Sequence, residues 1–567
     1  VSTTTENSEQ NTTGKVITVD NAQSLQDAIE AAPTDGTETT ISIEGEIALS
    51  SDLEIPANKT ITICGKDASS KITTSEKNTI AIKGTLTLTE LNIGGQMNVG
   101  YAPITVMADN AKLFTDKVTI ENTQTSGSDS FAGSAQGIQI AASKADVNTG
   151  INDAVIDLKQ SKIQLYATSA RGIAFAGTPS ENTLTLNNTQ IYNGADPINV
   201  WLGGYSRGID LRNTSNTIIK IQNQSQIAGF QYAINSPRNT ETTGLEVYVD
   251  HSDIRGWTSF NVWSEAGIFS ISNSTLTGMN GNYNGDKKYS FSAFVINSDI
   301  YNNGWGQAEN NKVILNNTTV NAITNDDQPV ETLLRIDVDS TDVEFQGTIT
   351  FNDNTNGKAG AVFDIGNMDD PLAFIERNKD IENNATVSRP NGNALFPEYE
   401  LKNTFGDGKT SYGESFVDFI GGVDYEGAEA NNETVILLKN VDASDFSVNA
   451  EEGHGNQFGG WTLDLAGYTL NVAEWSGDKI HVIDSSLNKT GNIIVNNNKV
   501  LKARIGNICY TSFEAALQAA NDNDTIELIA DASFDSIPTI DETITIAIND
   551  NITVTGFNNL KHSDASL

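Results

Sequence analysis

Residues 182–191 read NTLTLNNTQI, and this stretch carries the pattern that decides the fold. Leu184 and Leu186 alternate with polar residues, which is the period of a β-strand with one buried face. Four polar residues then separate Leu186 from Ile191, a spacing that suits a tight turn leading into a second strand. The stretch therefore predicts two short strands joined by a turn.

The same element, an apolar residue followed by four mostly polar residues and a second apolar residue, recurs along the chain. Clear copies occupy residues 158–163, 186–191, 249–254, 271–276, 295–300, 315–320 and 338–343, and a looser copy ends at residue 227. The closing residues of the last six copies are 227, 254, 276, 300, 320 and 343, a period in the low twenties. One coil of a parallel β-helix, with its three short strands and three turns, has this length. The sequence therefore predicts an all-β fold, a right-handed parallel β-helix.

The turn of each copy carries a polar residue, usually an amide, at one aligned position. His251 occupies this position in its own copy, and the equivalents are Gln160, Asn188, Asn273, Asn297, Asn317 and Ser340. Stacked amides can bond the backbone and one another from coil to coil. We expect an amide ladder at this turn, with His251 replacing an amide and Asp250 as a turn residue.

Three segments have the pattern of short amphipathic helices: SLQDAIEAA at 24–32, SFVDFIGGV at 415–423 and SFEAALQAA at 512–520. In each segment apolar residues recur at i, i+3, i+4 and i+7, which forms one face of a helix. Ser24, Ser415 and Ser512 are the expected N-caps. A helix laid across the first coil of a β-helix would cover its unpaired strand edges and apolar end. Each segment therefore predicts a short N-terminal capping helix.

These starts divide the chain into units. We expect a flexible polar leader at 1–15, a main parallel β-helix at 16–405, a second short β-rich unit at 406–500, and the truncated start of a third unit at 501–567. Cys64 aligns with Ala466 and Ala547 in equivalent strands of the three units. This alignment predicts that Cys64 is a small core residue.

Composition excludes several classes of function. The chain of 567 residues has a formal net charge of −39, which disfavours nucleic acid and anionic lipid as partners. Its two cysteines cannot form a disulfide framework, and its four histidines form no zinc motif. No apolar run is long enough to span a membrane. No cofactor is expected, although carboxylates in DVDSTDVE at 337–344 and NDND at 521–524 could bind calcium.

The helical starts, together with GWTLDLAGYTL at 460–470 and the coil pattern, resemble the pectate-lyase-like adhesive modules of large Gram-positive surface proteins. The resemblance covers most of the chain. It implies a secreted or cell-wall-associated protein that binds a glycan, a mucin or another host or cell-surface protein without catalysis.

An enzyme of the same fold is the alternative. VYVDH at 247–251 is similar to the V-W-I-D-H stretch beside the calcium site of pectate lyases. Lyases of that kind use carboxylates to hold calcium and an Arg or Lys as base, so Asp250, Asp253 and Arg255 are the first residues to consider. The alternative function is a polysaccharide lyase or glycoside hydrolase acting on acidic polysaccharide.

Other enzyme motifs are incomplete. The R-x-P-x-x-R motif of pectate lyases has only SPRN at 236–239 as a partial match, and this stretch precedes the D-H pair. Gly453-His454-Gly455 and Asp326-Asp327 are fragments of polygalacturonase motifs without their usual neighbours. We therefore predict no catalytic residue.

Aromatic residues gather in the middle of the chain. Exposed rings stack on the apolar faces of sugars while nearby polar groups bind hydroxyls, so such a group suits glycan binding. The alternative is that the rings pack inside the coils or under loops. The predicted ligand-binding residues are Trp201, Tyr205, Arg207, Asp250, Asp253, Arg255, Trp257, Trp263 and Trp305.

Overall fold

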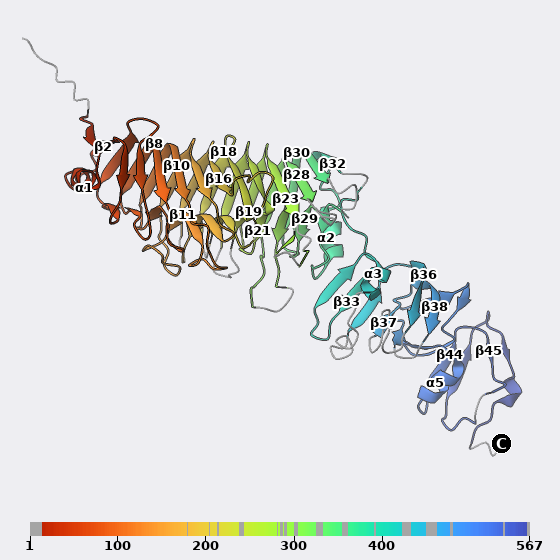
Figure 1. Cartoon of the computed structure of the whole chain (residues 1–567). Coiled ribbons are helices and arrows are strands. Elements are labelled where there is room, and N and C mark those ends of the chain that lie inside the picture. Colours follow the sequence, from red (N-terminus) through yellow and green to blue (C-terminus); the bar gives the residue numbers. More distant parts are fainter. Residues whose placement is uncertain are drawn as a thin grey trace, which may run out of the picture. The chain divides into compact units, whose positions relative to one another are not determined.

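The chain forms two compact units, one comprising residues 1–365 and 370–396 and the other 366–369 and 397–567. The predicted boundary at 405 and the three-unit division stay predictions. The computed structural model (Figure 1) describes residues 14–177, 180–202, 204–211, 215–236, 243–280, 282–283, 287–288, 292–299, 304–324, 333–353, 361–389, 393–421, 433–449, 462–476, 480–536 and 539–563.

The first unit is the predicted right-handed parallel β-helix, in which each strand pairs in parallel with its counterpart in the next coil. Its strands line three faces. The first face consists of β1 (Ile17–Val19), β2 (Glu38–Ile43), β5 (Thr60–Gly65), the start of β8 (Thr85–Gly95) and of β10 (Lys112–Asn122), β12 (Val155–Lys159), β15 (Thr183–Asn187), β18 (Ile218–Gln222), β20 (Glu246–Asp250), β22 (Ile268–Ser272), β27 (Lys312–Asn316) and the start of β30 (Asp342–Asp353).

The second and third faces follow in each coil. The second face consists of β3 (Glu46–Ala48), β6 (Lys71–Thr73), the ends of β8 and β10, β13 (Lys162–Leu165), β16 (Gln190–Asn193), the starts of β19 (Gln226–Asn235) and β21 (Asp253–Val262), β23 (Thr275–Asn280), β28 (Thr319–Thr324), the end of β30 and β32 (Ala385–Ser388). The third face consists of β4 (Leu53–Ile55), β7 (Ile80–Ile82), β9 (Ile104–Val106), β11 (Ala135–Ile140), β14 (Ala170–Phe175), β17 (Arg207–Leu211), the ends of β19 and β21, β26 (Phe294–Ile296), β29 (Leu334–Ile336) and β31 (Phe363–Asp364).

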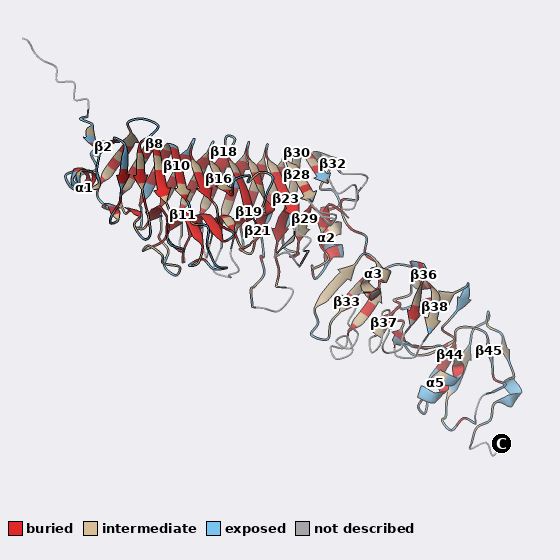
Figure 2. Cartoon of the chain, viewed as in Figure 1, coloured by how far each residue is buried: buried red, intermediate tan, exposed pale blue. Residues whose placement is uncertain are grey.

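Inward-facing residues form rows along the axis because the strands pair in register, and buried residues, red in Figure 2, recur in strands of successive coils. On the first face, Leu186, Ile221 and Val249 occupy one row and are fully or almost fully buried. On the third face, Ile234 is followed in register by Phe260, whose ring stacks on the next aromatic residue, Phe294, at 4.9 Å between centroids. Alternating apolar residues thus build a continuous core.

The turn between the first and second faces, called the first turn below, confirms the repeated element but corrects the ladder. Gln160, Asn188, His251, Asn273 and Asn317 all have a left-handed backbone, with φ between 45° and 51°. Amides tolerate this conformation better than most residues, which explains their recurrence. Their side chains are exposed rather than stacked inside the turn.

The ladder inside the first turn consists of hydroxyls from the residue that follows each left-handed position. The backbone N–H of Ser161 donates to Thr189 Oγ1 at 3.2 Å, and the N–H of Thr189 donates to Ser225 Oγ at 3.0 Å. Thr189 Oγ1 also donates to the carbonyl of Leu158 at 2.9 Å. The members of this hydroxyl ladder are buried: Ser161, Thr189, Ser225, Ser252, Ser274 and Thr318.

Two copies of the predicted element were aligned wrongly. Leu276 pairs directly with Val320, so residues 276–320 form one long coil and not two. Asn297 follows β26 on the third face, and Ser340 lies between the third and first faces, where its Oγ accepts a hydrogen bond from the N–H of Asn310 at 2.8 Å. The same spacing arises there because this corner also joins two strands through a polar turn.

Helix α1 (Ala22–Glu30) is the predicted N-terminal cap. It buries Leu25, Ala28 and Ile29, but its N-cap is Asn21 and not Ser24, because the Asn21 side chain accepts the Ser24 N–H at 2.9 Å. At its other end, the buried Lys59 ammonium donates to the carbonyls of Ile29 at 2.9 Å and Glu30 at 2.6 Å. A cation there satisfies the free carbonyls and stabilises the helix dipole.

A second helix at the other end of the β-helix was not predicted. Helix α2 (Pro371–Asn378) has Asp370 as its N-cap and Pro371 in its first turn, a standard start signal. Phe374 of this helix is fully buried and meets Phe363 edge-to-face at 6.0 Å. The last coil is therefore covered by an aromatic helix face.

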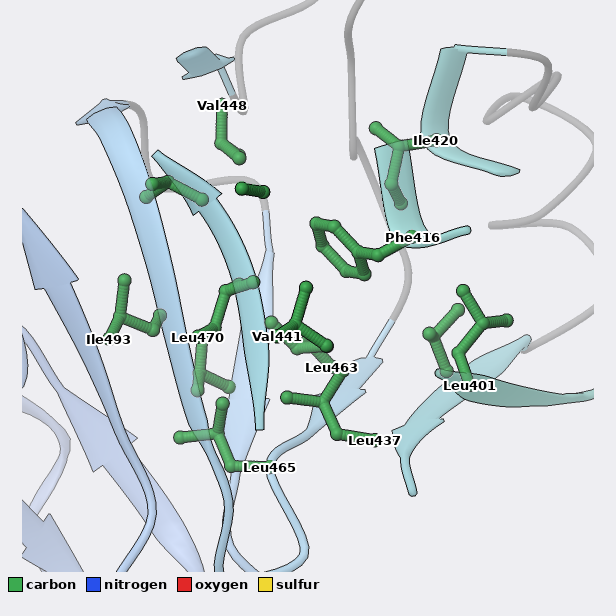
Figure 3. Close-up of a cluster of buried hydrophobic side chains, with 14 of the residues drawn as sticks. Leu401, Phe416, Ile420, Leu437, Val441, Val448, Leu463, Leu465, Leu470 and Ile493 are labelled. Atoms are coloured by element: carbon green, nitrogen blue, oxygen red, sulfur yellow. The ribbon is translucent and has the colours of Figure 1, made fainter. Parts of the chain in front are cut away.

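The second unit contains a nine-stranded mixed sheet and two smaller sheets. Helices α3 (Phe416–Gly421) and α5 (Phe513–Ala519) begin at the predicted caps, since the Ser415 hydroxyl accepts the Asp418 N–H and the Ser512 hydroxyl accepts the Ala515 N–H. In the core around α3 (Figure 3), Phe416 and Ile420 lie with buried residues of the neighbouring strands such as Leu463.

The strands of the second unit are short. They are β33 (Leu401–Thr404), β34 (Thr410–Gly413), β35 (Thr434–Leu437), β36 (Val441–Asn449), β37 (Thr462–Asp464), β38 (Thr469–Ser476), β39 (His481–Ile483), β40 (Asn492–Val495), β41 (Asn498–Lys499), β42 (Ala503–Ile505), β43 (Ile508–Tyr510), β44 (Thr525–Leu528), β45 (Ala532–Ser533), β46 (Thr545–Ile548) and β47 (Val554–Thr555).

The prediction for Cys64 was wrong. Cys64 pairs with Ser42 and Thr89 in an outward-facing row of the first face and is half-buried, because its neighbour Ile63 takes the inward position. Cys509 is buried, and burial raises the pKa of its thiol to about 12. Both cysteines are free.

Candidate functional site

The third face of the middle coils carries polar and aromatic side chains that contact one another on its outer side. The connections that lead to this face vary in length, and the segment 194–206 between β16 and β17 is one of the longer ones. It carries Trp201 and Tyr205 and ends at Arg207. A loop of this kind covers outward-facing residues that would otherwise be exposed to solvent. Charged side chains on this face are therefore partly desolvated.

Three aromatic rings and a guanidinium form a group on this face. Trp201 stacks on Trp257, with centroids 5.7 Å apart and planes at 25°. The Tyr232 ring, on the preceding coil, lies 6.3 Å from the Trp257 ring, and the Arg207 guanidinium lies over the Tyr232 ring at 4.5 Å. Trp257 is only 2% exposed, whereas Trp201, Tyr232 and Arg207 are half-buried. Trp257 therefore supports the group from below and does not present a free ring face, which corrects its expected role in stacking on a ligand.

The loop that carries Trp201 is held from the second face. Arg255 Nη1 donates to the carbonyl of Ile198 at 3.1 Å, and its Nε donates to Asp253 Oδ2 at 3.3 Å. Gln226 Nε2 donates to the same Asp253 oxygen at 2.8 Å. Asp253 and Arg255 thus fix the position of the loop that brings Trp201 over Trp257.

A row of hydrogen-bonded side chains, called the polar row below, runs along the third face from coil to coil. Each amide donates to the preceding coil, with distances of 2.9 Å, 2.9 Å and 2.8 Å. Arg335 Nη2 donates to the last amide at 3.2 Å. The polar row consists of Asp210, Asn235, Asn261, Asn297 and Arg335.

Both ends of the polar row are paired with a further charge. Arg171 Nε donates to Asp210 Oδ2 at 2.7 Å, and both side chains are only 7% exposed. Arg335 is paired with Asp337 at 3.0 Å. Burial acts to raise the pKa of Asp210, but the charges of Arg171 and Arg207 outweigh burial, and the pKa of Asp210 is lowered overall.

Arg207 stands beside this ion pair. It is the register partner of Arg171 in the next coil. Its Nη1 donates to Gln231 Oε1 at 2.7 Å and to the carbonyl of Ser206 at 3.2 Å. Burial is the largest influence on the pKa of Arg207 and lowers it.

The structure brings together some of the predicted residues and not others. Trp201, Tyr205, Arg207 and Trp257 belong to the loop and strands of this face, and Asp253 and Arg255 anchor the loop. Trp263 and Trp305 form a separate pair, edge-to-face at 5.7 Å and 85°. The two rings of that pair pack on each other, in line with the alternative that the aromatic residues pack inside the coils or under loops.

Asp250 belongs to a different environment. It lies on the outer side of the first face, where its Oδ1 accepts from Asn273 Nδ2 at 3.0 Å and lies 2.9 Å from His251 Nδ1. The hydrogen bond from Asn273, followed by the influence of His251, lowers the pKa of Asp250. The His251 side chain is 63% exposed. Asp250 and His251 thus belong to the exposed first turn and do not join Arg207 and Trp201.

Sequence reasoning missed Arg171, Asp210, Tyr232 and the polar row. A signal was present, because Arg171-Gly172-Ile173 and Arg207-Gly208-Ile209 repeat the same three residues at equivalent places. A Cβ added to Gly172 would lie 2.5 Å from the Gly208 carbonyl oxygen, so glycine is required between coils. Repetition of Arg-Gly-Ile therefore marks two neighbouring coils of the third face.

No group of three or more His, Cys, Asp or Glu residues is arranged to hold a metal ion in the described ranges. In DVDSTDVE, Asp337 is bound to Arg335, as described above. Calcium binding at 337–344 or 521–524 stays a prediction. Asp326-Asp327, Gly453-His454-Gly455 and most of SPRN lie outside the described residues.

Comparisons with known proteins found similar solved structures but no matching family. No family model matches the chain, and no curated protein matches it. Among solved structures, an alginate lyase from Paenibacillus sp. str. FPU-7 is 15% identical with a TM-score of 0.33, covering 62% of this chain and 98% of its own. A double mutant of the tailspike protein of E. coli bacteriophage HK620 is 11% identical with a TM-score of 0.38, covering 82% of this chain and 77% of its own. The A-module of the Azotobacter vinelandii mannuronan C-5 epimerase AlgE6 is 9% identical with a TM-score of 0.30, covering 83% of this chain and 94% of its own.

None of the helices in the described part of the chain is long and apolar enough to cross a membrane.

Proposed function

We propose that this protein is a non-catalytic glycan-binding β-helix protein of the adhesin type. The observation that carries the proposal is the group of half-buried Trp201, Tyr232 and Arg207 over the buried Trp257. Rings fixed by stacking lose little conformational freedom when a sugar binds, and the adjacent guanidinium can donate to hydroxyl or acidic groups. The resemblance to adhesive modules supports a secreted or cell-wall-associated location and a glycan, mucin or surface-protein partner.

The alternative, a polysaccharide lyase, has less support from the geometry. Its three candidate residues divide between two environments, since Asp250 bonds Asn273 and Asp253 bonds Arg255 and Gln226. Arg255 also donates to the carbonyl of Ile198, so its Nε and Nη1 both take part in bonds that hold the loop. A general base must be able to take a proton from the substrate, and a charged guanidinium bound in this way is a poor candidate.

Binding can be tested on an array of neutral and acidic oligosaccharides from plant polysaccharides and mucins. Trp201→Ala is expected to weaken binding at least tenfold, which corresponds to about 1.4 kcal/mol. Trp305→Ala is the matched control because Trp305 also packs on another tryptophan, Trp263, away from the Trp201 group. Equal losses in both variants, or no loss in Trp201→Ala, would remove the support for this site.

Catalysis can be tested separately by mass spectrometry of glycans incubated with the protein in calcium and in chelator. We expect no unsaturated or hydrolysed oligosaccharides under either condition. Products that disappear in Asp250→Ala would replace the adhesin proposal with the enzyme alternative. Binding that requires calcium, without products, would support a calcium site in a non-catalytic protein.

A further inference from the structure

We infer that Arg207 receives a single acidic group, a carboxylate or a sulfate, of a glycan whose neighbouring sugars are neutral. The inference rests on the proposed function and names the chemical class of its ligand. It begins from an imbalance of charge on the third face, where two arginines share one carboxylate.

Each oxygen of the Asp210 carboxylate already accepts one hydrogen bond. Its Oδ2 accepts from Arg171 Nε at 2.7 Å, and its Oδ1 accepts from Asn235 Nδ2 at 2.9 Å. Both partners and Asp210 are fixed by the register of three consecutive coils. Among the described residues, Asp210 therefore forms its ion pair with Arg171, while Arg207 acts on it only through its charge.

Arg207 makes no ion pair within the described part of the chain. The charges of Asp210 and, more weakly, Asp129 act to raise the pKa of Arg207. The hydrogen bonds of its guanidinium, however, go to the neutral oxygens of Gln231 and Ser206, both through Nη1. Its Nε and Nη2 have no partner among the described residues. A guanidinium has five donors in a planar fork, and two adjacent nitrogens suit one carboxylate or sulfate.

The position of Arg207 is set before any ligand binds. The guanidinium rests on the Tyr232 ring at 4.5 Å, and Gln231 is buried. A preorganised cation that is half-buried and lacks a counter-ion gains more from an incoming anion than an exposed cation does, because part of its desolvation cost has already been met during folding. This makes Arg207 the residue on this face that is best placed to take an acidic group.

The remaining surroundings limit the ligand to one with sparse charge. The half-buried rings of Tyr232 and Trp201 belong to the same group as Arg207, and aromatic rings suit uncharged sugar faces. The chain carries a net charge of −39, so a polyanion would meet long-range repulsion. A neutral glycan that bears one acidic sugar or one sulfate satisfies both conditions.

The test uses the full chain and pairs of glycans that differ only in charge: lactose, sialyllactose and sulfated lactose, with polygalacturonate as the polyanion. The same comparison extends to an array in which each neutral oligosaccharide has a sialylated, uronic-acid or sulfated counterpart. We expect the acidic member of a pair to bind at least tenfold more tightly than the neutral member and than polygalacturonate per sugar unit. The sialylated and sulfated arms distinguish a carboxylate from a sulfate.

Variants separate this inference from the proposed function. Arg207→Gln should abolish the preference for the acidic member, and Arg207→Lys should retain part of it, since lysine keeps the charge but not the planar fork. Trp201→Ala should weaken both members of a pair. Lys220→Gln, which removes an exposed cation on the first face, should leave the preference unchanged. Thermal unfolding of each variant confirms that it is folded.

Equal affinity for both members of every pair, or an acidic preference that survives in Arg207→Gln, would overturn the role of Arg207 while leaving glycan binding intact. Tighter binding to polygalacturonate than to the singly charged glycans would overturn the sparse-charge ligand. An absence of binding to every glycan on the array would contradict both the inference and the proposed function.

Discussion

The first turn of the β-helix repeats the same hydrogen-bonding pattern in successive coils, whereas the third face varies from coil to coil. At the first turn, coil after coil repeats a left-handed residue followed by a buried hydroxyl, and the bonds run to the backbone. On the third face, the connections differ in length, and the bonds of the polar row run between charged and amide side chains. The comparison teaches that the repeating side fixes the coils, whereas the varied side can hold specific chemistry.

The largest effect is expected where the third face buries charge. Asp210→Ala should lower the free energy of unfolding by about 3–5 kcal/mol, because Arg171 then remains buried without its counter-ion. The double variant Arg171→Met/Asp210→Leu should lose clearly less, since it leaves no buried charge. Urea unfolding followed by circular dichroism measures both. A double variant as unstable as Asp210→Ala would show that the polar row, and not the unpaired charge, determines the loss.

A smaller effect on the same pair is expected from acid. The folded-state pKa of Asp210 lies below its ordinary value of 3.8, so its contribution to stability is complete above that pH and disappears as pH falls through the folded-state pKa. Protonation leaves both oxygens in place, so the loss should be smaller than in Asp210→Ala. The difference in melting temperature between the wild type and Arg171→Met/Asp210→Leu should stay constant from pH 7 to about 4 and change only below about 4. A difference that changes between pH 5 and 7 would contradict this assignment.

The smallest effect is expected at the first turn. Thr189→Val keeps the shape of the side chain but removes the hydroxyl that accepts from Ser161 and donates to the carbonyl of Leu158. The expected loss in unfolding free energy is about 2 kcal/mol, since two hydrogen bonds of about 1 kcal/mol each are lost. Thr185→Val, on the outer side of the first face, is the matched control and should change stability by less than about 0.5 kcal/mol. A loss as large as that of Asp210→Ala would remove the distinction between the two regions.

The sequence allowed the repeating side to be predicted well. Alternation such as Leu184 and Leu186 identified the strands, and the spacing of Ile227, Ile254 and Leu276 identified successive coils. The hydroxyl ladder was not predicted although Ser or Thr follows each left-handed residue, because the adjacent amide recurs with the same period and the sequence does not show which of the two side chains is buried. The false copies at 295–300 and 338–343 show that another corner of the coil can reproduce the same spacing.

The varied side was predicted only in part. Trp201 and Trp257 were expected to lie together and do stack on each other, but their role in ligand binding stays a prediction. Pairing across coils was not predictable, since Arg171 and Asp210 are far apart in the chain and separated by loops of irregular length. Asp250 and Asp253 are close in sequence, but the first turn lies between them, so Asp250 is on the first face and Asp253 on the second.

The polar row also has a direction and two definite ends. Each asparagine both donates and accepts, so it can join a neighbour on either side, while Asp210 only accepts and Arg335 only donates. A coil bearing one more asparagine could therefore be duplicated or deleted within the row without leaving an unmatched group, whereas loss of either terminal coil would leave one. In evolutionary terms, Asp210 and Arg335 are the boundaries that limit how the polar row, rather than the whole β-helix, can grow or shrink.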